Sequence, residues 1–582
     1  SSFVDSRTGF FEMGMDSVLA TRLVSRIELE IGITLHANAV FDRPTVDELA
    51  ESLAEMWSPG AISSEPESPS PAGDLNLERV VYTVNWESAD PGPTSSVSEP
   101  AGPLVIFDLD DRVRTRVTSC KGWPGQQVIL VLPGEDYARR NESTYCVRPD
   151  HPEDFQRLHA DVGSLPEAVW YLWTRRAGDN DIGLLDSSTF PACRLVRSIV
   201  SARPSESIGF LYVHEFEETP NPVHEGFGGF GRSVRHESPN VLVRTMGLEM
   251  TDLSENERAS RIAELCLREL GGDVAPEQEI RYRWGRRWVR VLREARTDES
   301  ASPCSNFDTD GACVITGGAG GLGLIFARHL IDRGWKNLVL TGRSAETERH
   351  RMEVNELRRL GAQVSYHAVD VTDYCAINDL MGEVRSQHGR VTGIIHAAGI
   401  LDDGMLVGRS IEQMRTVIAP KLSGALNLDA ATSEDPLEFF VVFSSMAAIG
   451  GNPGQTDYAF ANRFLCAFVS SREEKRISGQ RHGVSRALVW PTWREGGMDI
   501  DEETRDTMLR RLGIAQLDTE SGVGTFEAAL SGEDPEVGVV VADLGRLSSL
   551  LPVERFQDTP TTSAESELEI LLADLGFGSD GS

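Results

Sequence analysis

The sequence lacks the features that mark metal-bound, disulfide-bonded or membrane-spanning proteins. Its 582 residues include eight cysteines, but these are scattered and form no CxxC pair. We therefore expect no metal site and no disulfide framework, and a reducing, cytoplasmic location fits. No run of about 18 apolar residues is present, so no membrane-spanning helix is expected. The first residues also lack the basic and apolar segments of a secretory signal.

Positive charge is scarce as well. The chain carries 56 Lys and Arg residues against 90 Asp and Glu residues, a formal net charge of −34. Such a surface would repel a phosphate backbone, so nucleic acid is not an expected partner. Hydrophobic residues make up 40% of the chain and charged residues 25%, which is ordinary for a soluble globular protein. At about 100–200 residues per domain, the length predicts about three domains.

Changes in composition divide the chain into five segments. Residues 1–57 form a short helical unit, and residues 58–78 are a Ser/Pro/Glu-rich linker that cannot bury a core. Apolar strand-like runs alternate with helical patterns in residues 79–305 and again in residues 306–553, which is typical of βαβ sheets. Residues 554–582 form a Ser/Thr/Glu-rich tail with no assigned role.

The two α/β units resemble a degenerate repeat. The first has apolar runs at 103–107, 127–133, 208–213 and 241–246. Its opening strand is followed not by a Gly-rich turn but by Asp-Leu-Asp-Asp (108–111), whose carboxylates would repel a pyrophosphate. We therefore predict an α/β fold with two Rossmann-like subdomains, a structural one that binds no dinucleotide and a catalytic one, preceded by a small all-α helical bundle.

The strongest cofactor signal is TGGAGGLG at 316–323. A short apolar strand (312–315) runs into Gly318-x-Gly320-x-x-Gly323, and an amphipathic helix follows. The glycines allow a tight turn and a close backbone approach. The helix N-terminus then offers free N–H groups to a pyrophosphate.

The later strands indicate how the rest of a dinucleotide would be held. Arg343 ends a strand 20 residues after Gly323, where an NAD-preferring site places a carboxylate. An arginine there suits a 2′-phosphate and favours NADPH, although a solvated arginine at a strand end has the same sequence pattern. Asp370 could accept from the adenine amino group, and His396 would form a wall of the site without donating a proton. The predicted cofactor-binding residues are Thr316, Gly317, Gly318, Gly320, Gly321, Leu322, Gly323, Arg343, Ser344, Asp370, Val371, His396, Ala397, Ala398, Gly399, Lys421 and Tyr458.

A second group of residues suits the reduction of a ketone. The stretch 438–462 predicts a buried strand, a Ser-rich turn, a loop and a helix start. Tyr458 is suited to donate the proton and Ser445 to hydrogen-bond the carbonyl, but a Tyr with a pKa of ~10 is a poor acid unless a cation lies close. Short-chain reductases usually place a Lys four residues after the Tyr. Here that position is Asn462, and the candidate cation is Lys421 on a predicted helix upstream.

With these offsets, residues 79–553 resemble the ketoreductase domain of modular polyketide synthases, within the short-chain dehydrogenase/reductase superfamily. That family exchanges the Lys and Asn positions, and here Lys421 precedes Tyr458 by 37 residues and Ser445 precedes it by 13. The family's motifs appear as TGGAGGLG, HAAG, FSS and PGQTDYAFAN. The resemblance implies that Tyr458 donates the proton, that Ser445 orients the carbonyl, and that Lys421 lowers the Tyr pKa and holds the nicotinamide ribose. Asn462 would position Lys421 or a relay water.

Three positions bear on the stereochemistry and activity that the resemblance implies. Leu401-Asp402-Asp403 resembles members that give a D-configured β-hydroxyl, which makes Asp403 a stereocontrol residue. Gly450 stands where members giving the L-hydroxyl carry Trp, and Phe460 stands where an epimerising subtype carries Pro. Pro491 departs from the family's Trp-Gly-x-Trp, which predicts a modest loss of activity.

The N-terminal unit resembles an acyl carrier protein. Leu19, Leu23, Ile27 and Ile31 share one helix stripe, and Thr45 with Glu48 forms a capping box for a second helix. Gly14-Met15-Asp16-Ser17 matches the carrier motif whose Ser bears phosphopantetheine, whereas a bare Asp-Ser pair would simply be a helix N-cap. About one carrier helix is missing before Phe10, so we expect a piece of a larger polypeptide. Its carrier belongs to the same module or to the preceding one.

The resemblance therefore predicts a segment of a multifunctional enzyme of antibiotic or other secondary-metabolite biosynthesis. It would reduce the β-keto group of a carrier-tethered acyl thioester with NADPH. The expected partners are the β-ketoacyl chain on a carrier, ketosynthase, acyltransferase or dehydratase domains, and a phosphopantetheinyl transferase acting on Ser17. Two alternatives stay open: a catalytically silent ketoreductase that serves as a scaffold and carrier-docking module, and a stand-alone short-chain alcohol dehydrogenase fused to a helical interaction domain.

Overall fold

The protein is described by a computed structural model that covers most of the two α/β units. The described residues are 45–56, 76–89, 102–119, 128–174, 181–270, 278–295, 307–496, 502–543, 545–546 and 553–554, with a few isolated positions before residue 45. Ser17, most of the first predicted carrier helix, most of the 58–78 linker and the tail from 555 lie outside them, so the expectations for these parts stay predictions. No helix in the described part of the chain is long and apolar enough to cross a membrane.

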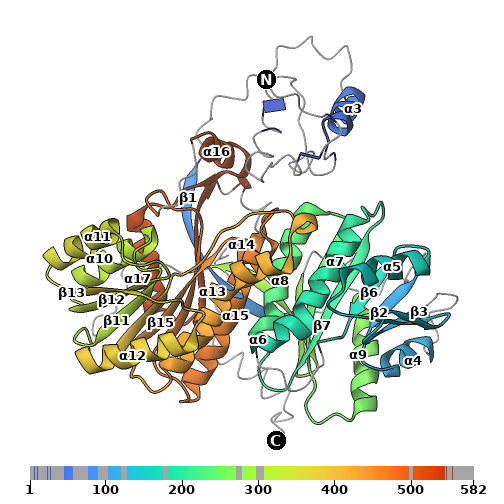
Figure 1. Ribbon diagram of the computed structural model, residues 1–582, viewed down its shortest axis with the longest axis horizontal. Coiled ribbons are helices and arrows are strands. Elements are labelled where there is room, and N and C mark those ends of the chain that lie inside the picture. The colour runs from blue at the N-terminus through green and yellow to red at the C-terminus, as the bar shows by residue number, and fades with distance from the viewer. Residues whose placement is uncertain are drawn as a thin grey trace, which may run out of the picture.

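The second helix predicted for the N-terminal unit is present as α3 (Val46–Met56). Thr45 caps it as expected, because its Oγ1 accepts a hydrogen bond from the backbone N–H of Glu48 at 3.2 Å. The Glu48 carboxylate lies 3.9 Å from Arg203, just beyond α7 (Phe190–Ser201). Both side chains are exposed, so this contact contributes little to holding α3 above the α/β body (Figure 1).

The catalytic half is a parallel sheet with strand order β13-β12-β11-β14-β15-β16-β18. Its strands are β11 (Ala312–Thr316), β12 (Asn337–Gly342), β13 (Gln363–Ala368), β14 (Val391–His396), β15 (Phe439–Ser445), β16 (Val484–Trp490) and β18 (Glu536–Asp543). Counted along the chain, the order is third, second, first, fourth, fifth, sixth, seventh, which is a doubly wound arrangement. The apolar runs noted in the sequence form these strands because both faces are covered by helices.

The first half repeats the same arrangement. Its strands lie side by side in the order β5-β3-β2-β6-β7-β8-β9, all parallel to their neighbours. They are β2 (Leu104–Phe107), β3 (Val128–Pro133), β5 (Thr144–Val147), β6 (Ala168–Tyr171), β7 (Ile208–Phe216), β8 (Val241–Glu249) and β9 (Glu279–Arg283). The matching order confirms the prediction of two Rossmann-like subdomains.

Two long strands join the halves into one 19-stranded sheet (Figure 1). β1 (Leu77–Ser88) pairs antiparallel with β18 of the catalytic half and with β10 (Arg286–Glu294), which pairs antiparallel with β9. β1 therefore begins inside the predicted linker and belongs to the seam between the halves. Sequence periodicity could not show this, because strand partners far apart in the chain are chosen by tertiary packing.

Further helices and short strands complete the described part of the fold. The helices are α4 (Arg112–Ser119), α5 (Pro152–Val162), α6 (Asp181–Leu184), α8 (Pro222–Glu237), α9 (Glu255–Leu270), α10 (Gly321–Asp332), α11 (Glu348–Arg359), α12 (Tyr374–His388), α13 (Ile411–Ala431), α14 (Ala447–Gly450), α15 (Thr456–Ile477), α16 (Glu502–Thr507) and α17 (Thr519–Ser531). The short strands are β4 (Ala138–Asn141), β17 (Ile514–Ala515) and β19 (Val553–Glu554).

The halves also meet through α8 and α15, each of which follows the fifth strand of its own half. Two glycines of α8 let the helix axes come close. A Cβ on Gly226 would lie 3.0 Å from the Phe460 ring, and a Cβ on Gly229 would overlap the carbonyl oxygen of Ala459. The first half therefore packs directly against the helix that begins beside Tyr458 (Figure 1).

A buried ion network reinforces this helix pair. Arg463 of α15 donates to Glu225 of α8 at 2.8 Å and to Glu279 of β9 at 2.7 Å. All three side chains are buried, and removing one partner of such a network typically costs about 3–5 kcal/mol. The first half thus fixes the helix that carries two of the four predicted catalytic residues.

Candidate active site

The predicted site residues gather at one edge of the catalytic sheet. The Gly-rich loop follows β11, Arg343 and Ser344 follow β12, and Asp370 and Val371 follow β13. The 396–399 segment lies at the end of β14. Because neighbouring parallel strands end at the same edge, these segments, which are far apart in the chain, lie side by side there.

The loop after β11 has the shape needed for a phosphate cradle. Gly317 adopts a φ of +64°, and a Cβ there would lie 2.9 Å from the carbonyl oxygen of Ala397. A Cβ on Gly323 would lie 2.5 Å from the carbonyl oxygen of Gly317. Glycine is therefore required at both positions, and α10 starts at Gly321 with its first N–H groups facing the loop. These residues fit a dinucleotide.

Arg343 and Asp370 are both exposed at this edge. No hydrogen bond or ion pair engages the Arg343 side chain within the described part of the chain, so its guanidinium is available to an anion. Asp370 Oδ1 already accepts from the N–H and the hydroxyl of Thr372, at 2.9 and 2.8 Å. Its second carboxylate oxygen can still take a bond from a ligand amine.

His396 ends β14 and lies inside the protein at this edge of the sheet. Its ring is fully buried, and its Nδ1 is hydrogen-bonded to Thr316 Oγ1 at 2.7 Å. Burial, helped by the nearby Lys421 charge, lowers the pKa of His396 to about 3, so the ring stays neutral. A Cβ on Gly424 would lie 2.8 Å from the ring, so α13 seals it from the other side. The role of His396 as a wall of the site stays a prediction.

Lys421 reaches the end of β15 from α13. Its side chain is 4% exposed, and Nζ donates to the carbonyl of Phe443 at 2.8 Å. Nζ also lies 5.8 Å from the centre of the Tyr458 ring. A Cβ on Gly399 would come within 3.0 Å of Lys421 Cε, so that glycine leaves room for the lysine. Burial lowers the pKa of Lys421 to about 8.

Tyr458 and Asn462 lie on the first turns of α15, and Ser445 ends β15. Burial raises the pKa of Tyr458, while hydrogen bonds from Ser445 and Asn462 act in the opposite direction. Asn462 Nδ2 donates to the backbone carbonyl of Tyr458 at 2.8 Å, and its buried Oδ1 has no hydrogen-bond partner in the described part of the structure. That oxygen can accept from a water or an ammonium. Because Lys421 Nζ faces Phe443, its predicted effect on the Tyr458 pKa stays a prediction.

The Leu401-Asp402-Asp403 segment lies beside the loop that leads to Tyr458. Asp403 accepts from Gln455 Nε2 at 3.0 Å, and the Gly404 N–H donates to the Gly454 carbonyl at 2.8 Å. Asp403 also raises the pKa of Tyr458. The residue predicted to control stereochemistry therefore lies beside the loop that leads to the predicted proton donor.

Two charged residues of this region were not anticipated from the sequence. Arg409 is buried and binds Asp457 at 2.5 Å and Asp402 at 2.8 Å. Burial raises the pKa of Asp457 to about 6 although Arg409 opposes the rise. Asp457 directly precedes Tyr458, so this bridge ties the Tyr to the 401–403 segment. In the sequence, only the Asp directly before Tyr458 could have indicated this bridge, and an Asp at that position by itself indicates no more than the start of a helix.

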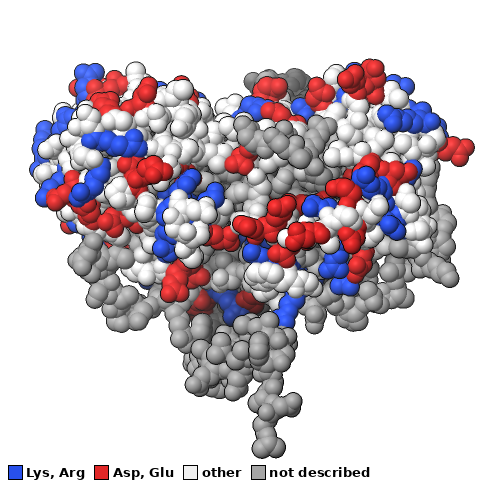
Figure 2. Space-filling model, turned by 90° about the horizontal axis from the view of Figure 1, so that it is seen from below, with Lys and Arg blue, Asp and Glu red and all other residues white. Residues whose placement is uncertain are grey.

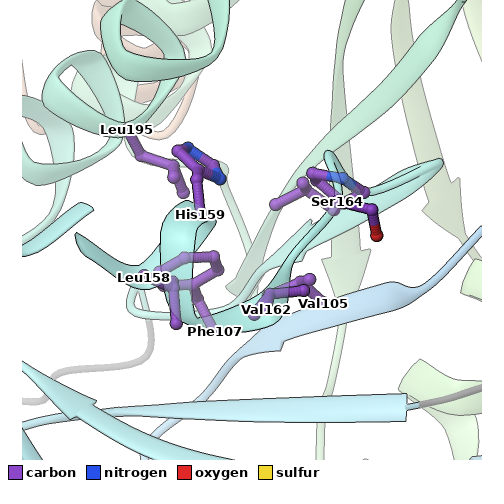
Figure 3. A pocket seen from close by; sticks show the side chains of 9 residues that line it. Val105, Phe107, Leu158, His159, Val162, Ser164 and Leu195 are labelled. Carbon is purple, nitrogen blue, oxygen red and sulfur yellow. The ribbon is translucent and has the colours of Figure 1, made fainter. Parts of the chain in front are cut away.

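The equivalent edge of the first half carries carboxylates in place of a glycine-rich loop. The Asp110 carboxylate accepts from the N–H of Arg112 at 2.8 Å, where α4 begins. An internal carboxylate thus lies at the start of α4, and the expectation that this half binds no dinucleotide stays a prediction. A cavity of about 10 Å³ lies nearby between Phe107, His159 and Leu195 (Figure 3). It has room for about one water.

Acidic and basic side chains are interspersed over both halves (Figure 2). On the face shown, no extended basic surface gathers that would suit a nucleic-acid backbone.

Comparison with known families assigns the parts of the chain. Residues 311–495 match the family described as KR domain, and residues 2–53 match the family described as phosphopantetheine attachment site. Residues 102–269, which form most of the first half, match the family described as beta-ketoacyl synthase-like, N-terminal.

The curated relatives are large polyketide synthases. Polyketide synthase PksN of Bacillus subtilis (strain 168) is 30% identical over 431 residues, which cover 73% of this chain and 8% of PksN. Polyketide synthase PksL of the same organism is 36% identical over 276 residues, 47% of this chain and 6% of PksL. The chain thus spans less than a tenth of the length of either relative.

Solved structures agree with these matches. A ketoreductase domain from the bacillaene assembly line superimposes with a TM-score of 0.63 at 26% identity, covering 82% of this chain and all (100%) of that one. An N-terminal ketoreductase from the macrolactin assembly line gives a TM-score of 0.71, covering 91% of this chain and 99% of that one, and at 23% identity it shows the fold alone. The chain therefore belongs to the modular polyketide synthases, and it carries a phosphopantetheine-attachment domain followed by a ketoreductase domain.

Proposed function

We propose that this chain reduces the β-keto group of a carrier-tethered acyl thioester to a D-configured β-hydroxyl with NADPH. The observation that carries the proposal is the convergence of Tyr458, Ser445, Lys421 and Asn462 beside the Gly-rich loop. These residues come from α15, β15 and α13, and the Lys421 ammonium lies 5.8 Å from the Tyr458 ring. A scaffold without activity would have no need to keep a desolvated lysine there, because burial lowers its pKa to about 8.

Reduction of a ketone requires a hydride at carbon and a proton at oxygen. When bound, NADPH supplies the hydride and becomes NADP⁺. The Tyr458 hydroxyl donates the proton to the oxygen, which Ser445 hydrogen-bonds as negative charge develops on it. The resulting tyrosinate is stabilised by the Lys421 ammonium, and a water held by Asn462 Oδ1 returns the proton from solvent.

The preference for NADPH rests on Arg343. Its exposed guanidinium at the end of β12 can bind a 2′-phosphate with two parallel hydrogen bonds, whereas the ribose hydroxyls of NADH would offer it no charge.

The D outcome rests on the 401–403 segment. Asp403 and Gly404 are hydrogen-bonded to the loop before Tyr458, so this segment borders the path by which a ketone reaches the Tyr hydroxyl. The face that the ketone shows to the hydride depends on the side from which its acyl chain enters.

The carrier and the partner domains are proposed from the family to which the chain belongs. Ser17 would bear phosphopantetheine after action of a phosphopantetheinyl transferase, and the acyl chain would arrive on a carrier in the cytoplasm. Ketosynthase, acyltransferase or dehydratase domains of the same assembly would supply the substrate or take the product.

The test is NADPH consumption with a small β-ketoacyl thioester. The wild type should turn over, and Tyr458→Phe should lose on the order of 10²–10⁴-fold in kcat because the proton donor is gone. Tyr137→Phe is the matched control, since that hydroxyl lies in the first half and donates to Asp161 at 2.7 Å. Equal rates for wild type and Tyr458→Phe would refute the mechanism. Cofactor binding without turnover in the wild type would favour the silent scaffold.

A further inference from the structure

The last turn of α8 contacts both loops that border Tyr458. Glu237, the final residue of that helix, is 8% exposed. Its Oε2 accepts from the N–H of Leu406 at 2.7 Å, and its Oε1 accepts from the N–H of Gly454 at 3.0 Å. Leu406 opens a short 3₁₀ turn (Leu406–Gly408) just after the 401–403 segment, and Gly454 lies four residues before Tyr458.

The same two loops are tied to each other directly. The Gly404 N–H donates to the Gly454 carbonyl at 2.8 Å, and Gln455 Nε2 donates to Asp403 at 3.0 Å. Glu237 also links the two loops, so the hydrogen bonds of Glu237, Gly404 and Gln455 form a closed set that joins the 401–406 segment to the loop before Tyr458.

Other residues of α8 hold the same stretch of backbone. Ser233 Oγ accepts from the Asn452 N–H at 3.0 Å, and His236 Nε2 is hydrogen-bonded to the Gly450 carbonyl at 2.8 Å. Gly451 has a φ of +71°, and a Cβ there would lie 2.6 Å from the Arg232 backbone. The loop before Tyr458 is therefore shaped against the first half over several successive residues.

We propose that Glu237 is a positioning residue for the reduction: from the half without a cofactor site, it sets the spacing between the 401–403 segment and Tyr458 and thereby the face of the ketone that is reduced. This inference rests on the proposed function. Glu237 touches neither substrate nor cofactor and acts through the two backbone N–H groups that it binds.

A carboxylate is chemically required for this role. Its two oxygens accept one hydrogen bond each from two N–H donors. In Glu237→Gln one oxygen would be replaced by an NH₂ group that faces an N–H, so one of the two bonds would be lost without a change in size. Glu237→Asp would keep both acceptors on a shorter side chain.

The first measurement is the product ratio with a small β-ketoacyl thioester and NADPH, using the full chain. We expect Glu237→Gln to lower kcat by about tenfold with little change in KM for NADPH, and to raise the fraction of the minor β-hydroxy enantiomer on chiral chromatography. Glu237→Asp should recover most of the wild-type ratio. A folded Glu237→Gln with unchanged kcat and ratio would overturn the proposal.

A control separates positioning from general loss of stability. Glu269 is also a buried carboxylate of the first half, but it binds Arg244 at 2.7 Å and Arg287 at 2.8 Å. Glu269→Gln should lower the melting temperature and leave the product ratio unchanged. An equal shift of the ratio in Glu269→Gln would overturn the specific role of Glu237.

The second measurement does not depend on turnover. Amide hydrogen exchange of peptides covering 401–406 and 450–458 should be faster in Glu237→Gln than in the wild type and unchanged in Glu269→Gln. Unchanged exchange in Glu237→Gln would refute the inference even for a chain that reduces nothing. Faster exchange in a chain that binds NADPH without reducing a thioester would refute only the proposed function.

Discussion

Lys421 should make the protein less stable while making it active, and Lys421→Met tests both effects. Lys421 is 4% exposed, and burial lowers its pKa from 10.5 to about 8. One pKa unit corresponds to 1.36 kcal/mol, so keeping this lysine charged in the folded state costs about 3 kcal/mol. Removing the amine also removes its bond to the Phe443 carbonyl, which offsets the gain by about 1 kcal/mol.

The pH dependence gives the sharper prediction. Between pH 8 and 10.5 the unfolded chain keeps a proton on Lys421 that the folded chain has lost, so the free energy of unfolding of the wild type rises with pH. Relative to Lys421→Met, the rise should be about 1.4 kcal/mol per pH unit and about 3 kcal/mol in total. Below pH 8 both states carry the proton, and the difference should be constant, with Lys421→Met the more stable by about 2 kcal/mol.

The assay is denaturant unfolding of both proteins at pH 7, 8, 9 and 10. Lys475→Met, which removes an exposed lysine from α15, is the matched control and should keep a constant difference from the wild type. Activity should fall although stability rises: we expect the kcat of Lys421→Met to be lower than that of the wild type by a factor on the order of 10² or more. If the difference in free energy of unfolding between the wild type and Lys421→Met stayed constant from pH 7 to 10, the lowered pKa of Lys421 would be refuted.

Three further changes test other parts of the chain. Arg343→Ala should raise the KM for NADPH at least about tenfold and leave that for NADH nearly unchanged, because only NADPH has a 2′-phosphate; equal changes would refute the role of Arg343. Treatment with a phosphopantetheinyl transferase should add one phosphopantetheine mass to the peptide containing Ser17 and none in Ser17→Ala; no added mass would favour the fused alcohol dehydrogenase. Gly229→Ala should destabilise the fold by about 1–3 kcal/mol in thermal unfolding, since its Cβ would overlap the Ala459 carbonyl; a neutral result would contradict the close packing of α8 and α15.

Much of the fold was predictable because its strands are short apolar runs bounded by turns. The runs at 103–107 and 208–213 are β2 and the start of β7, and the Gly-rich loop lies between β11 and α10 as its pattern indicates. The repeat was also visible, because both halves place strands at similar intervals. The N-terminal carrier resemblance agrees with the family match at 2–53, whereas attachment at Ser17 stays a prediction.

The seam between the halves was not predictable. Nothing in residues 77–88 indicates that this strand pairs with β18, more than 440 residues later, as well as with β10. Glu237, Arg409 and Asp457 were missed for a similar reason, because each has an ordinary local context. Their roles depend on hydrogen-bond and ion-pair partners that lie on other elements.

By itself the sequence determined which chemical groups are present and at which spacing: a glycine loop for a dinucleotide, a Tyr and a Ser, and a Lys exchanged with Asn462. These are local patterns of residue type and spacing, so they can be recognised before the fold is known. Only the tertiary structure decided that burial would lower the pKa of Lys421 and that side chains of the first half would hydrogen-bond the loops beside Tyr458. Desolvation and long-range hydrogen bonds depend on which segments pack together, and that is settled by the whole fold.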